Sequence, residues 1–392
     1  MNNFVFQNPT KIYFGKGSIS NLVAELSKVG PRVLLTYGGG SIKKNGIYNA
    51  AISSLAKANK TVYELSGIMP NPRKEKVYQG IDICKTNNVD FILAVGGGSV
   101  IDCSKFIAAG AKTDRDFWQS FLVNQEDCYD AIPLASILTL AGTGSEMDAG
   151  GVISDFENNL KLHYGHPLLF PKFSILDPEY TYSLPKEQLV YGSIDAISHI
   201  LEVYFSKPDE SNLSDDLAEA ILKNLITNLD VALKNHDDYI ARSNLMWCST
   251  LAINGLISLG KEGDWMSHEI EHALSAFYDI PHGAGLAIVH PNYLMHVYKS
   301  AIPKFAKFAS NIFGISSSTL DEEGRARAGI IALSNYFKQI GAPTTLGEVN
   351  IPSSEIQKIA KTVNLFNTSY ARKFSLKDIE SILVKSINHL EN

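Results

Sequence analysis

The hydrophobic positions in the first half of the chain fall into short runs that are separated by turn-forming residues. Apolar runs of this length, bounded by glycine, proline or asparagine, are typical of strands, many of them fully buried. The predicted strands lie in residues 4–14, 31–37, 61–65, 90–95 and 132–138. Helical spacing of apolar residues occurs between them, near Ile47, over residues 74–87 and from Val100 onward. This alternation predicts a parallel sheet of the doubly wound, Rossmann-like type.

The pattern changes after Pro185, where long segments with helical periodicity follow one another and few strand signals remain. The predicted helices are about 186–205, 213–234, 238–259, 264–277, 284–298, 303–312, 323–340, 354–363 and 376–390. A chain of 392 residues exceeds one typical hydrophobic core. We therefore expect an α/β domain over residues 1–185 and an all-helical domain over residues 186–392.

The composition is that of an ordinary globular protein, with 45% hydrophobic and 19% charged residues. A net charge of -6 without basic clusters argues against nucleic acid or a membrane surface as a partner. Four cysteines, none in a Cys-x-x-Cys motif, suit a reducing compartment. The chain starts without a signal-peptide pattern and has no long apolar span. A cytoplasmic location is the expectation.

Glycine-rich loops follow three of the predicted strands. Residues 38–41 and 96–99 both read Gly-Gly-Gly-Ser, and residues 141–145 form a third such loop. Glycine lets the backbone approach a ligand closely, and the helix that follows offers free N–H groups to phosphate. Neither glycine triplet is a Gly-x-Gly-x-x-Gly motif or a P-loop, and steric needs of the turns alone are the alternative explanation. Three loops at strand ends of one parallel sheet favour a ligand with a pyrophosphate.

The first loop bears on which dinucleotide would bind. Sites that select NAD place an acidic residue near the ribose 2′-hydroxyl, whereas residues 37–41 contain none. Lys43 and Lys44 follow, and they suit a 2′-phosphate. The loop therefore favours NADPH, unless the lysines are only solvated charges at a helix start.

Metal-binding side chains are concentrated in the second half. Asp195 and His199 are spaced i, i+4, as are His268 and His272, and His282 follows in a Pro-His-Gly loop. On a helix this spacing puts both side chains on one face. A carboxylate with three imidazoles is a suitable ligand set for a divalent transition metal. Pairs with this spacing also occur as surface or capping pairs. Residues 268–272 match the His-Glu-x-x-His motif of metalloproteases as well, but a protease would leave the glycine loops unexplained.

These motifs, in this order and spacing, resemble the iron-containing (group III) alcohol dehydrogenases over essentially the whole chain. The motifs are Gly96-Gly-Gly-Ser-Val-Ile-Asp102, Ala141-Gly-Thr-Gly-Ser-Glu146, Asp195-x3-His199 and His268-x3-His272-x9-His282-Gly283. Residues 37–46 and Leu245-Met-Trp247 look like the NADPH-dependent butanol dehydrogenase branch. The resemblance implies a Rossmann-like domain followed by an all-helical metal-binding domain, as in dehydroquinate synthase-like folds.

The resemblance also implies roles for individual residues. The metal ligands would be Asp195, His199, His268 and His282. His272 would lie beside the metal without binding it, either as the catalytic proton relay or as a residue that only orients a ligand. The metal would be iron(II), with zinc(II) as the alternative.

The cofactor implied is NADP(H). Gly38, Gly39 and Ser41 would hold the 2′-phosphate, and Gly97, Gly98, Ser99 and Asp102 the pyrophosphate and nicotinamide end. Thr139, Thr143, Asp148 and Lys161 would line the cofactor cleft. Trp265 stands where many members of the family have glycine. The family also implies a homodimer.

The expected activity is hydride transfer between the nicotinamide and a short- to medium-chain aldehyde such as butanal. The metal is expected in a cleft between the domains, and apolar residues near its ligands predict a mostly apolar pocket. The alternatives are a polyol (glycerol-type) dehydrogenase or a dehydroquinate-synthase-like lyase of the same superfamily, and a non-catalytic nucleotide-binding or metal-sensing protein. A lyase would need a cluster of basic residues near the metal, and Lys261 is the one candidate nearby.

Overall fold

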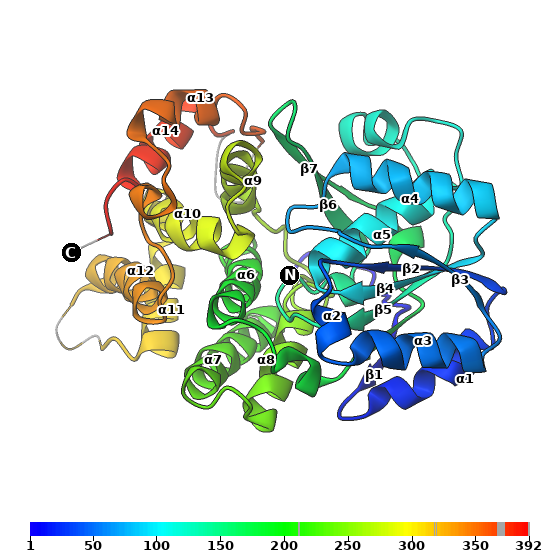
Figure 1. Ribbon diagram of the computed structural model, residues 1–392. Helices are drawn as coiled ribbons and strands as arrows, with labels where there is room; N and C mark the ends of the chain where they lie inside the picture. The colour runs from blue at the N-terminus through cyan, green and yellow to red at the C-terminus, as the bar shows by residue number, and fades with distance from the viewer. Residues whose placement is uncertain (211, 317, 319, 367–372, 391–392) are drawn as a thin grey trace. The chain divides into compact units, whose positions relative to one another are not determined.

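The computed structural model describes residues 1–392 except 211, 317, 319, 367–372 and 391–392. In the described part of the α/β unit, six parallel strands form one sheet in the order β1-β8-β5-β4-β2-β3 (Figure 1). They are β1 (Lys11–Phe14), β2 (Arg32–Tyr37), β3 (Thr61–Leu65), β4 (Phe91–Gly96), β5 (Leu134–Leu138) and β8 (Phe173–Leu176). The predicted Rossmann-like parallel sheet is confirmed.

Helices cover both faces of this sheet, as Figure 1 shows. They are α1 (Leu22–Leu26), α2 (Ser41–Lys44), α3 (Ile47–Lys57), α4 (Lys74–Asn87) and α5 (Gly98–Gly110). Alternate residues of β2 enter different cores: Leu34 packs with α4 and α5, whereas Val33 and Leu35 pack with α1 and α3. Side chains on successive strand residues point to opposite faces, so a strand that is covered on both sides is apolar throughout.

A hairpin and the strand β8 were not predicted from the sequence. The hairpin consists of β6 (Gly150–Asp155) and β7 (Leu160–Gly165), which pair antiparallel.

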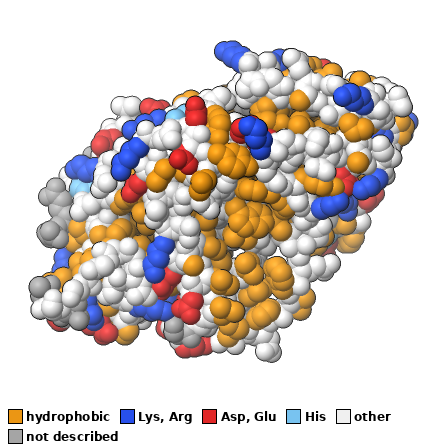
Figure 2. Space-filling model, turned by 90° about the horizontal axis from the view of Figure 1, so that it is seen from below, with side chains coloured by type: hydrophobic (Ala, Val, Ile, Leu, Met, Phe, Trp, Pro, Cys, Tyr) orange, Lys and Arg blue, Asp and Glu red, His pale blue; other side chains and the backbone are white. Residues whose placement is uncertain are grey.

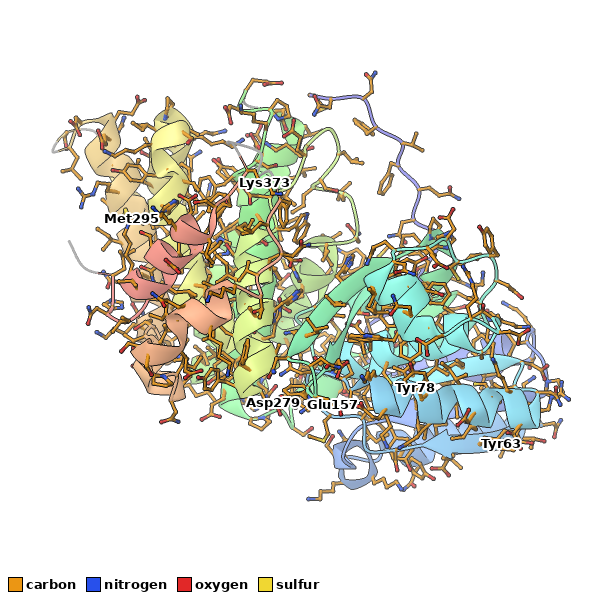
Figure 3. The ribbon with its side chains drawn as sticks, turned by 90° about the horizontal axis from the view of Figure 1, so that it is seen from above. Tyr63, Tyr78, Glu157, Asp279, Met295 and Lys373 are labelled. Carbon is orange, nitrogen blue, oxygen red and sulfur yellow. The ribbon has the colours of Figure 1, made fainter. Side chains whose placement is uncertain are left out.

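On the face covered by α4, Tyr78 (Figure 3) stacks edge-on against Phe117 with ring centroids 4.7 Å apart and donates a hydrogen bond to Asp116. These contacts attach α4 to the segment that follows α5.

Helices joined by loops make up the second unit, and no strand is assigned among its described residues. Its helices are α6 (Lys186–Tyr204), α7 (Leu213–Lys234), α9 (Met266–Tyr278), α10 (His282–Val297), α11 (Ile302–Phe313), α12 (Glu322–Gln339), α13 (Ile356–Ala360) and α14 (Leu376–Lys385). The helix predicted over 238–259 is the main error, because α8 (Tyr239–Leu251) ends eight residues earlier. Gly255 and Gly260 beyond it adopt positive φ angles, which an α-helix does not allow.

The chain divides into two compact units whose boundaries differ from the division expected from sequence, 1–185 and 186–392. Residues 7–185 and 235–250 make up one unit, and residues 1–6, 186–234 and 251–392 make up the other. Most of α8 packs with the sheet unit: Met246 lies in its core, and Thr250 donates a hydrogen bond to Glu146. Residues 1–6 lie with the helical unit, where the amide of Asn2 donates to the carbonyl of Gly260.

Hydrophobic side chains are also present at the surface, where Figure 2 shows them gathered in broad areas. In the sheet unit the exposed ones include Phe14, Tyr239, Ile240 and Trp247. Among the described residues, no helix combines the length and the apolar character that crossing a lipid bilayer requires.

Candidate metal centre and cofactor loops

Three helices of the second unit bring together all five of the predicted metal-site residues. Asp195 and His199 lie one turn apart on α6, and His268 and His272 lie one turn apart on α9. His282 is the first residue of α10. Four of the five are buried, and the side chain of His282 retains 24% of its exposure. The predicted spacing on helical faces is therefore what the structure has.

Three imidazole nitrogens surround one carboxylate oxygen. The Nε2 atoms lie near Asp195 Oδ1, that of His199 at 3.4 Å, that of His268 at 3.7 Å and that of His282 at 3.4 Å. These separations are too long for ordinary hydrogen bonds. Separations of this size occur between ligand atoms that each lie about 2.1 Å from one ion, and the ligand atoms of Asp195, His268 and His282 all lie within 4.8 Å of one another.

Unsatisfied polar atoms support the same interpretation. Asp195 Oδ1 and His268 Nε2 are buried, and neither has a hydrogen-bond partner in the described part of the chain. Buried polar atoms without partners are rare, and one common explanation is that they bind an ion. The imidazoles of His199 and His268 stack in parallel, with centroids 4.8 Å apart. The residues present thus fit a divalent metal with carboxylate and imidazole ligands.

Electrostatics in this cluster favour a cation. Burial alone would raise the pKa of the Asp195 carboxyl, but the neighbouring imidazoles of His199 and His282 hold that pKa far below its usual range. Burial lowers the pKa of His268, but the carboxylates of Glu202 and Asp195 outweigh it and raise the pKa to about 10. Without a metal, His268 is therefore a positively charged imidazolium at neutral pH, with a proton on both ring nitrogens. A metal ion that binds its Nε2 must displace the proton there, so metal affinity falls as the pH is lowered.

Two buried glutamates of the site were missed by the sequence analysis. Glu202 on α6 contacts Nδ1 of His268, and Glu271 on α9 contacts Nδ1 of His282. Glu202 continues the helical stripe of Asp195 at i+7, which was a usable signal. Glu271 lies within residues 268–272, where the metalloprotease pattern assigns importance to the other glutamate, at position 269.

His272 lies beside the cluster and apart from its centre. Its ring centroid is 5.6 Å from that of His282 and 6.3 Å from that of His268. His272, His282 and Glu271 form a second close group of potential ligand atoms, which shares His282 with the first. Because Nδ1 of His282 already contacts Glu271, this second group is a polar network at the edge of the centre.

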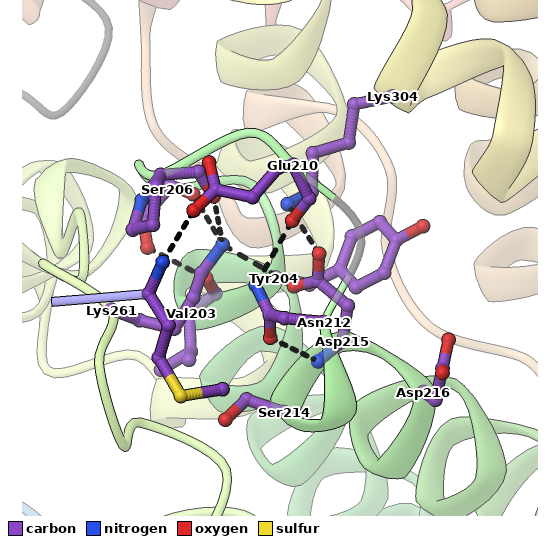
Figure 4. Close-up of polar contacts among 12 residues, drawn as sticks. Val203, Tyr204, Ser206, Glu210, Asn212, Ser214, Asp215, Asp216, Lys261 and Lys304 are labelled. Atoms are coloured by element: carbon purple, nitrogen blue, oxygen red, sulfur yellow. Dashed lines mark hydrogen bonds and ion pairs between the residues drawn. The ribbon is translucent and has the colours of Figure 1, made fainter.

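The segment before α9 is fastened to the end of α6. The side chain of Lys261 is fully buried, and its Nζ atom donates to the carbonyls of Ser206 and Pro208 at 2.5 and 2.9 Å (Figure 4). It also lies 3.2 Å from Asp215, whose other oxygen pairs with Lys304. All donors of Lys261 thus face partners within the fold. It serves as an anchor for this segment, and no phosphate-binding cluster forms around it in the described residues.

Trp265 follows the segment that Lys261 anchors and directly precedes α9, and its ring lies against two of the candidate ligands. Its ring is 5.6 Å from that of His268 and 6.0 Å from that of His199. Its φ angle is 66°, a left-handed conformation that a bulky residue adopts only at a cost. Gly263 leaves room for the indole, since a Cβ there would lie 2.8 Å from Trp265 Nε1. Trp265 therefore covers one side of the imidazole cluster.

The glycine loops lie together at one edge of the sheet. The strands β2, β4 and β5 are neighbours, and the loops 38–41, 97–99 and 139–145 follow their carboxyl ends. A Cβ on Gly98 would lie 2.3 Å from Thr143 Oγ1, so glycine is required where the second and third loops meet. The helix α5 begins at Gly98, and Gly97 before it provides no side-chain cap. Its free N–H groups are suitable for a phosphate.

The remaining predicted cofactor residues are partly committed to contacts within the fold. Both carboxylate oxygens of Asp102 accept hydrogen bonds, from Ser145 Oγ at 2.6 Å and from the amide of Val152 at 3.0 Å. Burial raises the pKa of Asp102 to about 6. The carboxylate of Asp148 pairs with the buried Lys105 at 2.5 Å. These two carboxylates attach the 145–152 segment to α5, next to the loop.

Three more of the predicted cofactor residues are Thr139, Lys161 and Ser99. Thr139 follows β5 directly, and its amide donates to the carbonyl of Gly96, which joins the second and third loops. Lys161 is buried on β7, opposite Ser154. Ser99 lies in the first turn of α5.

The first loop has an acidic neighbour that the sequence analysis missed. Glu64, near the end of β3, accepts hydrogen bonds from the hydroxyls of Tyr37 at 2.7 Å and Tyr48 at 3.0 Å. The Nζ atom of Lys43 lies over both tyrosine rings, at 5.0 and 4.6 Å from their centroids. Gly39 is exposed, and a Cβ added there would meet no atom within 4 Å. The predicted absence of an acid thus holds for the loop itself, but not for the adjacent strand.

Comparison with known proteins gives consistent matches along the chain. Residues 9–178 match the family model described as iron-containing alcohol dehydrogenase, and residues 189–387 match the model of the C-terminal part of the same family. Over 362 residues, the chain is 48% identical to the NADH-dependent butanol dehydrogenase A of Clostridium acetobutylicum, covering 92% of each chain. It is 39% identical over 363 residues to the NADPH-dependent aldehyde reductase YqhD of Escherichia coli, again covering 92% of each.

The solved structures agree with the sequence comparison. The crystal structure of NADH-dependent butanol dehydrogenase A from Thermotoga maritima matches with a TM-score of 0.95 and 40% identity, and the match covers 99% of both chains. A fold match of this extent includes the sheet unit, the helical unit and the segments that carry the five site residues.

Proposed function

Because this chain belongs to the iron-containing alcohol dehydrogenase family, we propose that it interconverts short- to medium-chain aldehydes and alcohols, with butanal as a representative substrate, and uses a nicotinamide dinucleotide. The observation that carries the proposal is the convergence of three imidazole Nε2 atoms on Asp195 Oδ1 at 3.4–3.7 Å. The glycine loops at the carboxyl ends of three neighbouring strands of the sheet unit are suited to the dinucleotide that this function requires.

In this function Asp195, His199, His268 and His282 hold the metal. A divalent ion held there would supply Lewis-acid polarisation of a carbonyl oxygen, and a reduced nicotinamide would supply the hydride. The residues of this chain bind and orient these groups. The N–H groups at the start of α5 bind the pyrophosphate, and the glycines around Gly98 let it approach the backbone.

His272 is the side chain proposed to provide the proton that the product alcohol needs. It lies at the edge of the centre, next to His282, the most exposed of the four ligands. Imidazole exchanges protons near neutral pH, so this position suits a relay. An orienting role through the network with Glu271 is the alternative. A pH–rate profile of His272→Gln separates the two, because loss of a relay removes one limb of the profile whereas loss of orientation lowers it evenly.

For the finer choice of cofactor we propose NADPH. The support is local: Gly39 is open to solvent, Lys43 lies close by, and the nearest acid, Glu64, already accepts hydrogen bonds from two tyrosine hydroxyls. The names of the relatives include both cofactors, since the clostridial enzyme is NADH-dependent and the Escherichia coli enzyme NADPH-dependent. For the metal we propose iron(II), with zinc(II) as the alternative that metal analysis of anaerobically purified protein would reveal.

The proposal is tested by following NADPH and NADH oxidation with a panel of aldehydes. We expect kcat/KM to rise from acetaldehyde to butanal and then to level off, because each buried methylene contributes about 0.8 kcal/mol until an apolar pocket is full. A preference for glyceraldehyde or dihydroxyacetone would instead identify a polyol dehydrogenase. Metal-loaded protein that turns over none of these compounds would contradict the proposal.

We also propose that the protein forms a homodimer in the cytoplasm. The large apolar side chains exposed on the sheet unit include those of Phe14, Tyr239, Ile240 and Trp247, and such residues are common at interfaces. The four cysteines are buried free thiols, which suits a reducing compartment. The molar mass in solution tests the dimer: a monomer at micromolar concentration would contradict it.

A further inference from the structure

We propose that Glu202 and Glu271 are positioning residues of the metal centre, and that each fixes one histidine ligand with its Nε2 atom toward the metal. The inference rests on the proposed function, because it assumes that the cluster around Asp195 holds a metal. It assigns a role to two side chains that would otherwise be unexplained buried charges, since both carboxylates are fully buried.

Glu202 connects α6 to the start of α9. Its Oε2 atom contacts Nδ1 of His268, and its Oε1 atom accepts a hydrogen bond from the amide of Ser267 at 2.7 Å. The amide of His268 lies 3.4 Å from the same oxygen. Glu202 therefore satisfies free N–H groups in the first turn of α9 and holds the His268 ring at the same time.

Glu271 makes the corresponding connection from α9 to α10. Its Oε2 atom contacts Nδ1 of His282, and its Oε1 atom accepts a hydrogen bond from Ser275 Oγ. The helix α10 leaves space for it, because a Cβ on Gly285 would lie 2.7 Å from Glu271 Cγ. A serine hydroxyl and a glycine are thus both arranged around this one carboxylate.

The chemical consequence follows from what a carboxylate can do. An ionised carboxylate only accepts hydrogen bonds, so Nδ1 must be the donor in both contacts. A neutral imidazole that donates from Nδ1 has its lone pair on Nε2. In both histidines that Nε2 atom faces Asp195 Oδ1, at 3.7 Å for His268 and 3.4 Å for His282. Each glutamate therefore selects the tautomer that can bind the metal, and its charge makes the imidazole a stronger ligand.

The arrangement is also sequential. A carboxylate of α6 holds a ligand of α9, and a carboxylate of α9 holds a ligand of α10. The helix α6 thereby fixes the ring that α9 contributes, and α9 fixes the ring that α10 contributes, so the ligand geometry depends on the packing of all three helices. Removal of either glutamate should loosen one ligand and leave the others in place.

The test compares metal affinities of Glu202→Gln and Glu271→Gln with that of the wild type, by competition with a chelator for cobalt(II). We expect each variant to bind the metal about 10–100-fold more weakly, the range typical of residues that support a metal ligand. The absorption spectrum of the cobalt protein should change as well, because the neutral amide of glutamine accepts a weaker hydrogen bond from Nδ1 and holds the imidazole less firmly than the carboxylate. Glu187→Gln is the matched control, since Glu187 is an exposed residue of the same helix α6.

A second control separates orientation from charge. Glu269 lies close enough to His268 to affect it electrostatically, yet among the described residues no hydrogen bond joins the two. Burial raises the pKa of Glu269 to about 7, so the variants are compared at about pH 8, where this carboxyl is mostly ionised. Under that condition Glu269→Gln should weaken metal binding by less than Glu202→Gln. Equal losses in the two variants would show that only the charge matters, which overturns the positioning role.

Folding of the variants is checked by circular dichroism of the metal-free proteins. Should a glutamine variant fail to fold, the aspartate variant at the same position decides, because it keeps the charge but is one methylene too short to reach Nδ1. Folded variants with wild-type cobalt affinity and spectrum would refute the inference. A wild-type protein that binds no divalent metal would instead refute the proposed function, so the two failures are distinguishable.

Discussion

A Cβ atom on Gly283 would lie 2.1 Å from the backbone carbonyl oxygen of Tyr191. The helix α10 can approach α6 this closely only because residue 283 has no side chain. His282 directly precedes Gly283 at the start of α10, and Asp195 lies one turn after Tyr191 on α6. The close approach of these two backbones therefore places the His282 imidazole next to the Asp195 carboxylate.

This relationship predicts that Gly283→Ala displaces α10 and damages the metal centre. Overpacking against a rigid backbone costs about 1–3 kcal/mol, and part of that cost should be relieved by a shift of His282. We expect a lower thermal midpoint and weaker metal binding, measured by calorimetry and metal analysis. Gly347→Ala is the matched control, because a Cβ at that position meets no atom within 4 Å. Unchanged metal content in Gly283→Ala would mean that α10 can retreat without consequence.

His268→Ala should remove the metal and the activity while the protein stays folded. His268 supplies one of only four proposed ligands, and its removal also leaves Glu202 as a buried carboxylate without its imidazole partner. The sheet unit has separate cores and should not be affected. Metal analysis and the rate of NADPH oxidation measure the two losses, and NADPH binding shows that the sheet unit stays folded. The control is His296→Ala, a histidine of α10 that pairs with Asp378 instead. A variant that keeps both its metal and its rate would show that His268 is not a ligand.

The backbone conformation at Trp265 predicts which of two substitutions, Trp265→Gly or Trp265→Ala, gives the more stable protein. With φ at 66°, any residue other than glycine is strained there. Trp265→Gly and Trp265→Ala both lose the indole, but only the alanine variant retains the strain. We therefore expect the glycine variant to be the more stable by about 1 kcal/mol, measured by urea unfolding, although glycine usually destabilises relative to alanine. Greater stability of the alanine variant would show that the segment relaxes to another conformation.

The cofactor preference is tested by Gly39→Asp. The position is open to solvent, is not confined to positive φ and has no neighbour within 4 Å of a Cβ, so the substitution should leave the fold unchanged. The new carboxylate would repel a 2′-phosphate and could accept a hydrogen bond from a ribose hydroxyl. We expect the ratio of kcat/KM for NADPH to that for NADH to fall by at least about tenfold, which corresponds to about 1.4 kcal/mol. A wild-type preference for NADH would contradict the assignment of this loop.

The elements that the sequence predicted well are those with one strong periodicity. The apolar runs that became β2 and β4 and the helical stripe of α6 each depend on local pattern alone. The hairpin was missed although β7 alternates apolar residues with Lys161 and His163, because its partner β6 has only Val152 and Ile153 as apolar positions and shows no strand periodicity. The helix predicted to reach residue 259 was extended too far because apolar residues continue past Leu251 while Gly255 and others break the backbone.

For the site, spacing was sufficient for ligands but not for their supports. An i, i+4 pair is determined within one helix, so Asp195 and His199 could be recognised from sequence. The partner of His268 is Glu202, 66 residues away, and that contact exists only after α6 and α9 pack. Glu64 was missed for the same reason, since its contact with Tyr37 requires β2 and β3 to be neighbours.

The buried carboxyl of Glu146 predicts how stability changes with pH. Burial raises its pKa to about 7, although a hydrogen bond from Thr250 at 2.5 Å favours the charged form. A carboxyl whose pKa is higher in the folded than in the unfolded state holds more protons when folded, so stability falls as the pH rises between the unfolded pKa, about 4.3, and the folded one. Glu146→Gln keeps an acceptor for Thr250 and has no charge to bury. From about pH 5 to about pH 8.5 the gain in stability of this variant over the wild type should grow by about 2–3 kcal/mol, measured by urea unfolding. Glu157→Gln, at an exposed position in the same unit, should show no such growth. A constant difference between Glu146→Gln and the wild type across this pH range would mean that Glu146 is ionised in the folded protein already at about pH 5.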